Sequence, residues 1–258
     1  MSPAELVTFE RRGNIALLTL NRPNARNAIS PEVSQTMAGL LDEIEADAAL
    51  RAVVLTGAGD VFSAGADLKV VAAGRGMEIS RGKGNFAGLV TRDFPKPIIA
   101  AVNGPALAGG FEIVLSCDLV IAADTARFGI PEVQRGLMAA AGGLIRLPKR
   151  VPLAVALELA MTGDPIDADR ALSLGLVNRV VARGEVLDAA CTLAERIGEN
   201  SPIAVRLSRQ LVREAAEMPE ADGWRRTNEL AVQIFASGDA VEGATAFAEK
   251  RKPVWKST

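Results

Sequence analysis

The sequence of 258 residues contains no histidine and no tyrosine. Without histidine, the chain has no Ser-His-Asp or Cys-His nucleophilic site, no HExxH zinc site and no imidazole acid or base. Any proton transfer that the protein carries out must therefore use carboxylates or lysines. We expect no metal site.

Cysteine is also scarce, and long apolar runs are missing. Cys117 and Cys191 have no short spacing between them, which predicts two reduced, buried thiols rather than a disulfide framework. The first fourteen residues lack the apolar stretch of a signal peptide. Asp118, Asp124 and several glycines interrupt the longest apolar run, so no segment is expected to span a membrane. These features indicate a cytoplasmic protein without a membrane partner.

The charge is nearly balanced, with a formal net charge of −2. Proteins that bind nucleic acid usually carry a basic excess, so we expect no nucleic acid partner. Gly57 and Gly59 lack the third glycine of a dinucleotide-binding motif, and no GxxxxGK[ST] loop is present. Bound NAD and nucleoside triphosphate hydrolysis are therefore not indicated.

Apolar runs that alternate with helical patterns predict an α/β core. Strands are expected at residues 14–21, 51–56, 97–102, 119–122 and 177–181, and helices at residues 108–116, 153–161 and 166–174. Residues 72–88 are rich in glycine and are expected to form a loop or lid. After residue 185 the pattern is helical, so we divide the chain into a core, 1–200, and a helical region, 201–258.

The best candidate for chemistry is the segment from Ala108 to Glu112, AGGFE, where a helix is expected to start. Two glycines there expose backbone N–H groups that suit a developing oxyanion, although glycines also allow close helix packing. Glu112 is a lone charge on an apolar helix face. Burial would raise the pKa of its carboxyl toward the range of a general base. A partly exposed glutamate is the alternative.

Two more segments are weaker candidates when each is taken alone. Glu132 follows Pro131 in FGIPE, which is also an ordinary helix start. In FSAGADL, residues 62–68, the N–H of Ala66 is a candidate for a second oxyanion donor. Asp67 beside it has an alternative role as a simple helix N-cap.

Together these segments resemble the enoyl-CoA hydratase/isomerase (crotonase) superfamily over nearly the whole chain. The resemblance rests on the order and spacing of NRPNARNA at 21–28, FSAGADL, PALAGG at 105–110, FGIPE, AGG at 141–143, MTG at 161–163 and the C-terminal segment around Glu249-Lys250-Arg251. It implies a spiral of ββα turns followed by a C-terminal helical region for oligomerisation. Homotrimers or dimers of trimers are expected.

The same resemblance assigns roles to residues. Ala66 and Gly109 would donate the two N–H groups of the oxyanion hole, and Glu112 and Glu132 would be the catalytic pair. Contacts to the acyl-CoA thioester would come from Arg26, Ala64, Ala66, Asp67, Leu68, Gly109, Phe247 and Lys250. The alternative for Lys250 is a solvated basic terminus. CoA would enter only as part of the substrate, with no cofactor.

Retention of both glutamates favours an enoyl-CoA hydratase, in which Glu112 activates water and Glu132 delivers a proton to the α-carbon. An enoyl-CoA isomerase or another acyl-CoA lyase or hydrolase is the alternative, and a non-catalytic crotonase-like binding protein is a more remote one. Many relatives have Pro-Gly where Ala139-Ala140 stands. This difference and the 74–88 loop leave the acyl group open, including a bulky or branched one.

Overall fold

The computed structural model describes residues 3–256 and contains two β-sheets. Six strands form the main sheet in the order β1-β2-β3-β4-β6-β9, and three form a small sheet in the order β5-β7-β8. The strands are β1 (Val7–Arg12), β2 (Ile15–Leu20), β3 (Ala52–Gly57), β4 (Ile98–Val102), β5 (Ala106–Leu107), β6 (Leu119–Ala123), β7 (Arg127–Gly129), β8 (Ile166–Asp167) and β9 (Arg179–Val181). In the main sheet only the β1–β2 pair is antiparallel.

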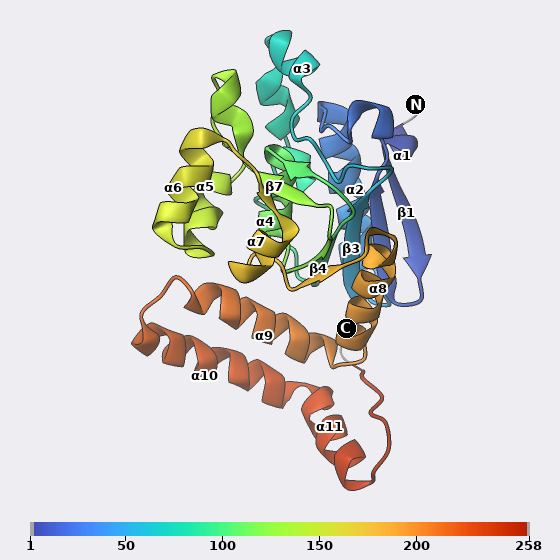
Figure 1. The fold of residues 1–258 in the computed structure, drawn as a ribbon. Helices are drawn as coiled ribbons and strands as arrows, with labels where there is room; N and C mark the ends of the chain where they lie inside the picture. Colours follow the sequence, from blue (N-terminus) through green and yellow to red (C-terminus); the bar gives the residue numbers. More distant parts are fainter. Residues whose placement is uncertain (1–2, 257–258) are drawn as a thin grey trace.

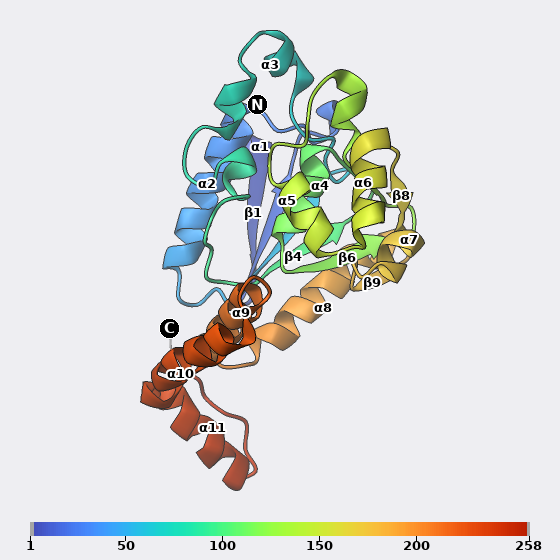
Figure 2. The same cartoon turned by 90° about the vertical axis from the view of Figure 1, so that its left-hand side faces the viewer.

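Helices surround this sheet and then continue beyond it (Figures 1 and 2). They are α1 (Pro3–Leu6), α2 (Pro31–Ala46), α3 (Leu68–Ala72), α4 (Gly109–Ser116), α5 (Gly143–Arg146), α6 (Leu153–Thr162), α7 (Ala168–Ser173), α8 (Val186–Gly198), α9 (Pro202–Ala215), α10 (Glu220–Ala236) and α11 (Gly238–Ala248). Short 3-10 helices at 131–135 (η4), 76–80 (η2) and 86–88 (η3) lie between them. No helix within residues 3–256 is long and apolar enough to cross a membrane.

The central strands are parallel and fully buried. Every residue of β3 (AVVLTG) and β4 (IIAAV) is buried, as expected for strands covered on both faces. Helix α8 covers one face and contacts β2, β3, β4 and β6. Both cysteines are free and buried, as predicted. Because the strands are parallel, their carboxyl ends meet at one edge of the sheet, where the next segments of the chain begin.

Beyond that edge the chain forms a spiral. After each of β2, β3, β4 and β6, it makes a short extended segment and then enters a helix. These extended segments pair in parallel from one turn to the next, through the bridges Ile29–Ala66 and Ser63–Ala106 and the β5–β7 pair. The starts of α3, α4 and η4 therefore lie on adjacent turns, which brings the predicted site segments together.

The turns approach so closely that glycine is required between them. A Cβ atom on Gly110 of α4 would lie 2.2 Å from the backbone oxygen of Ser63. A Cβ atom on Gly104 would lie 2.0 Å from the backbone oxygen of Asp60. Since these neighbours are backbone atoms, no side-chain rotation relieves the overlap.

Three features of the fold differ from the sequence prediction. Strand β1 was not predicted, because most of its residues are exposed, several of these are charged, and it pairs only with β2 at the edge of the sheet. The helix expected at 166–174 begins as strand β8, which pairs with β7 and is followed by α7. The 72–88 loop contains η2 and η3, and buried Phe86 anchors it.

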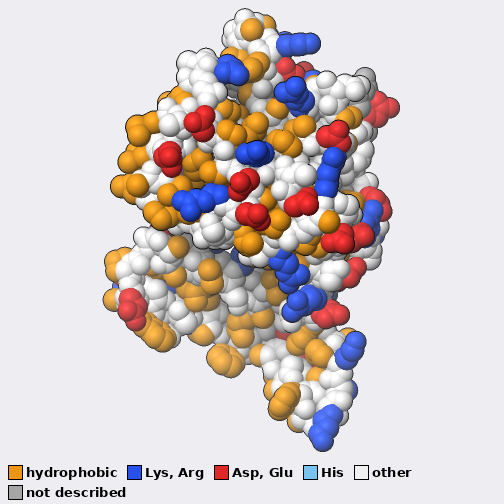
Figure 3. Space-filling view, in the orientation of Figure 1, with side chains coloured by type: hydrophobic (Ala, Val, Ile, Leu, Met, Phe, Trp, Pro, Cys, Tyr) orange, Lys and Arg blue, Asp and Glu red, His pale blue; other side chains and the backbone are white. Residues whose placement is uncertain are grey.

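The last three helices form a separate layer below the sheet (Figure 1). The space-filling view shows apolar side chains along these helices and over the edge formed by α5 and α6 (Figure 3). Large exposed apolar residues include Ile145, Leu153 and Met161 of α5 and α6, and Val232, Phe235 and Phe247 of the C-terminal helices. A role of residues 201–258 in oligomerisation stays a prediction.

Gly110→Ala should destabilise the protein by about 1–3 kcal/mol, because the added methyl group overlaps the Ser63 backbone. Gly39→Ala is the matched control, because Gly39 is also helical and a Cβ there would meet nothing within 4 Å. Gly39→Ala should raise the free energy of unfolding by up to about 1 kcal/mol, because alanine favours a helix more than glycine does. Urea unfolding of both variants measures the difference, and equal effects would contradict the close-packing argument.

Candidate active site

Helix α4 begins with an unusual backbone conformation. Ala108, which precedes the helix, has φ 53° and ψ −132°, a combination that costs a non-glycine residue on the order of 1–3 kcal/mol. Its N–H donates to the oxygen of Gly129 on β7, at 2.9 Å. The turn directs the chain into α4 with Gly109 as its first residue. Strain of this kind is common at functional sites.

The two predicted oxyanion segments are in contact. A Cβ atom on Gly65 would lie 2.6 Å from the Gly109 nitrogen, and Gly65 has φ +86°, so glycine is needed there on both counts. Within residues 3–256, the N–H groups of Ala66 and Gly109 have no hydrogen-bond acceptor. The fold therefore brings together two unused backbone donors, one of them at the positive end of a helix.

Glu112 lies in the first turn of α4 and is only 2% exposed. Its Oε1 accepts hydrogen bonds from the N–H groups of Ala141, at 2.8 Å, and Gly143, at 2.7 Å. Burial raises the pKa of Glu112, while these two N–H groups and the charge of Arg146 oppose the rise. Both backbone donors bind Oε1, so Oε2 remains for another partner.

Glu132 lies in η4 and is half-buried. Its Oε2 is buried and has no hydrogen-bond partner in the part of the chain that the structure describes. Burial is the main cause that raises the pKa of Glu132 to about 7, and the negative charge of Glu112 raises it further. The two glutamates therefore lie close enough to influence each other, and a buried carboxyl without a partner is costly unless it has a use.

The predicted substrate contacts in the N-terminal half lie near these donors. Ala64 is half-buried, and its N–H donates to the oxygen of Arg26, whose side chain is exposed. Asp67 caps α3 by accepting from the Lys69 N–H at 3.1 Å, and it pairs with Arg22 at 3.0 Å. The N-cap interpretation of Asp67 is thus confirmed. Leu68 is 52% exposed.

Phe247 and Lys250 lie elsewhere. Phe247 is 87% exposed near the end of α11, and Lys250 follows it with φ 54°. Figure 1 shows α11 at the opposite end of the molecule from α3 and η4. Within one chain these two residues are therefore remote from the glutamates, and their contact with substrate stays a prediction.

The partners of Glu112 were not predicted from the sequence: Ala141-Gly142-Gly143 stood out as a motif, but no role was expected for its backbone. Phe86 was not predicted as a site residue either. Its ring packs against Gly109, where an added Cβ atom would lie 2.4 Å from the Phe86 Cζ. For the loop 141–143, the paired glycines after an apolar stretch were the available sequence signal. For Phe86, no local sequence signal indicates a role.

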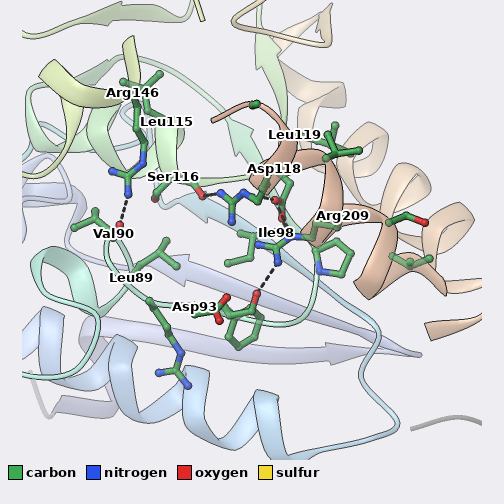
Figure 4. Close-up of a pocket in the computed structure, with 18 of the residues that line it drawn as sticks. Leu89, Val90, Asp93, Ile98, Leu115, Ser116, Asp118, Leu119, Arg146 and Arg209 are labelled. Carbon is green, nitrogen blue, oxygen red and sulfur yellow. Dashed lines mark hydrogen bonds and ion pairs between the residues drawn. The ribbon is translucent and has the colours of Figure 1, made fainter. Parts of the chain in front are cut away.

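A wide groove of about 1090 Å³ lies between α9 and the core (Figure 4). Its lining includes Leu115 and Ser116 at the end of α4, together with Arg146, Arg209 and Arg213, but neither Glu112 nor Glu132. The groove and the glutamates therefore lie toward opposite ends of α4. We place the candidate site at the N-terminal end of this helix, where the chemically useful groups converge.

Comparison with known proteins agrees with this geometry. The profile described as enoyl-CoA hydratase/isomerase matches residues 10–258. The carnitinyl-CoA dehydratase of Citrobacter koseri is 42% identical over 259 residues, covering 98% of this chain and 99% of that protein.

Solved structures match equally well. An enoyl-CoA hydratase from Mycobacterium tuberculosis H37Rv has a TM-score of 0.93 and 45% identity, covering 98% of this chain and 100% of that one. The carnitinyl-CoA hydratase from Mycobacterium avium has a TM-score of 0.78 and 46% identity, covering 98% of this chain and 99% of that one. The chain has the crotonase fold and belongs to the enoyl-CoA hydratase/isomerase family.

Proposed function

We propose that this protein is an enoyl-CoA hydratase, which adds water across the 2,3 double bond of an enoyl-CoA thioester and catalyses the reverse dehydration. The observation that carries the proposal is a pair of neighbouring carboxyls: buried Glu112, and half-buried Glu132, whose buried Oε2 has no partner and whose pKa is raised by burial and by the charge of Glu112. Hydration needs a base for the water and an acid for the α-carbon. An isomerase can move its proton with a single carboxylate, so the pair favours hydration.

The first requirement of this reaction is that the oxyanion formed on the thioester be stabilised. When water attacks the β-carbon, negative charge develops on the thioester oxygen. The N–H groups of Ala66 and Gly109 are unused and adjacent, which suits them to this oxygen. Each such donor contributes about 3–4 kcal/mol to transition-state stabilisation in comparable sites.

The two glutamates then divide the proton transfers. Two N–H groups hold Oε1 of Glu112, so Oε2 is the oxygen that takes a proton from water as the water oxygen bonds to the β-carbon. Glu132, with its pKa raised to about 7, retains a proton near neutral pH and delivers it to the α-carbon. Exchange of protons with solvent resets the pair. CoA belongs to the substrate, and these steps require no other cofactor.

The acyl group and the assembly are finer parts of the proposal. Similar proteins bear the names enoyl-CoA hydratase and carnitinyl-CoA dehydratase, so both a plain and a carnitine-type acyl group are candidates. We infer a homotrimer or a dimer of trimers in which Phe247 and Lys250 reach the CoA of a neighbouring subunit. The exposure of Phe247 and its distance from its own site support this arrangement.

Purified protein should remove the conjugated thioester absorbance of at least one of three substrates: crotonyl-CoA, a bulky enoyl-CoA, or the crotonobetainyl thioester that dehydration of carnitinyl-CoA would give. The ratio of kcat/KM values identifies the acyl class. Binding of all three esters without any turnover would contradict the hydratase assignment and favour an isomerase or hydrolase.

Glu132→Gln should lower kcat on the order of 10²–10⁴-fold, because a neutral amide cannot deliver the proton. Glu158→Gln, a change at an exposed glutamate of α6, is the matched control and should leave kcat unchanged. Near-native turnover by Glu132→Gln would exclude the two-glutamate mechanism.

The same variant should be more stable than the unaltered protein at pH 8. Between the ordinary value of 4.5 and the raised pKa of about 7, the folded state holds a proton on Glu132 that the unfolded chain releases. The stability contributed by this group is therefore lost as pH rises through that window. Glutamine has no charge to bury, so its advantage at pH 8 over pH 5 should be on the order of 1–3 kcal/mol. Urea unfolding at both values measures it, and an equal difference at both would refute the assignment.

The pH profile of hydration should be bell-shaped. Glu132 must be protonated, so kcat/KM should fall as pH rises beyond about 7, and Glu112 must be ionised, so it should fall again in acid. Because the carboxyls interact, the two apparent pKa values belong to the pair. Initial rates from pH 4.5 to 9 test this, and a flat profile from pH 6 to 9 would contradict it.

A further inference from the structure

Arg146 contacts the loop that binds Glu112, the proposed base. It is the last residue of α5, partly buried, and it lines the wall of the groove between α9 and the core. Its Nη1 donates to the oxygen of Ala141 at 3.3 Å, and its Nη2 donates to the oxygen of Val90 (Figure 4). One guanidinium group thus joins two segments that are far apart in the sequence.

The first of these segments is the loop that holds Glu112. The N–H groups of Ala141 and Gly143 bind the Glu112 carboxylate, while Arg146 binds the carbonyl of Ala141. Gly142 lies between them with φ +102°, and a Cβ atom there would lie 2.0 Å from Nη1 of Arg146. The glycine therefore leaves room for the guanidinium as well as for the turn.

The second segment supports the proposed oxyanion hole. Val90 lies four residues after Phe86, whose ring occupies the space beside Gly109 and excludes any Cβ there. The N–H of Val90 also donates to the oxygen of Phe86 at 3.3 Å. By binding the Val90 carbonyl as well as that of Ala141, Arg146 connects the segment 86–90 to the loop that binds Glu112.

The surroundings of Arg146 disfavour its positive charge, so burying an arginine here costs free energy. Burial lowers its pKa, and the neighbouring cations Arg213 of α9 and Arg150 lower it further, while the charge of Glu112 favours its charged form. An arginine nevertheless stays ionised under ordinary conditions. Glu112 is faced in turn by the charge of Arg146 and by Glu132 from η4. Arg146 is thus the cation that offsets part of the cost of ionising the buried base.

We propose that Arg146 is a positioning residue: its guanidinium fixes the loop 141–143 and the segment 86–90, and thereby holds Glu112 ionised and oriented to take a proton from water. This inference rests on the proposed hydratase function and adds a residue to it. Arg146 itself touches no reacting atom.

The test compares Arg146→Gln with Arg150→Gln. Arg150 lines the same groove and donates to the Cys117 oxygen at 3.2 Å, but among residues 3–256 it has no hydrogen bond to the loop 141–143. The carboxyl of Glu112 is titrated by ¹³C NMR, with its signal assigned from its loss in Glu112→Gln. Arg146→Gln should raise the Glu112 pKa by roughly one unit, because an opposite charge and the ordered N–H donors favour the carboxylate. Arg150→Gln should leave it unchanged.

Kinetics provide the second measurement. The acidic limb of kcat/KM should move upward in Arg146→Gln by the same amount, and kcat should fall about 10-fold or more because the base is misplaced. An unchanged Glu112 titration, or an equal shift in Arg150→Gln, would overturn the proposal. The NMR titration needs no turnover, so failure of the hydratase assignment would be seen separately, as inactivity of the unaltered protein.

A folding defect in Arg146→Gln, visible by circular dichroism, would move the test to Arg146→Lys. Lysine keeps the charge but has a single ammonium nitrogen in place of the two Nη groups that bind the two separate carbonyls, so it should not bind both at once. It should lower kcat about 10-fold with KM little changed, since orientation rather than substrate binding is lost. Unaltered kcat in that variant would contradict the positioning role.

Discussion

Burial of the Glu112 carboxylate is the constraint on which the rest of the site depends. A charge placed on an apolar helix face is stable only when other groups replace its hydration. Here the loop 141–143 provides two N–H groups, and Arg146 provides an opposite charge behind them. The loop needs glycine at two positions, because Gly142 has φ +102° and a Cβ on Gly143 would lie 3.0 Å from Glu112 Oε1. These groups offset the burial of the carboxylate only in part, so the pKa of Glu112 stays raised, which suits a carboxyl that transfers protons.

Helix α4 links this site to the groove between α9 and the core. All eight of its residues are buried, so little water screens its dipole. At its C-terminal end, Arg213 donates to the Ser116 oxygen at 3.0 Å and Arg150 to the Cys117 oxygen at 3.2 Å. Cations at this end complement the dipole, while the free N–H of Gly109 lies at the other end. The C-terminal helices, through Arg213 of α9, thus support the helix that carries the chemistry.

The spiral explains why chemical groups from three turns converge. Parallel pairing of Ser63 with Ala106, and of β5 with β7, aligns equivalent points of successive turns. Ala66, Gly109 and Glu132 all follow such points, so regular geometry alone makes them neighbours. The frame is common to a family with several activities, and fold does not imply function. In this chain the second carboxyl, at Glu132, is the feature on which the proposed hydratase activity rests.

Local sequence determined much of this structure. The continuous apolar runs of β3 and β4 and the glycine pair before Glu112 are patterns within a few residues, and each predicted its element. Strands β1 and β8 escaped prediction because their partners, rather than their own periodicity, make them strands. Likewise, the sequence predicted Glu112 from its place on an apolar helix face and Glu132 mainly from a family resemblance, but it did not predict what holds them. The bonds from Ala141 and Gly143 to Glu112 span about thirty residues. The link from Arg146 to Val90 spans 56. Only tertiary packing decides contacts of that range, because no local preference of the chain specifies which distant backbone group will face a buried charge.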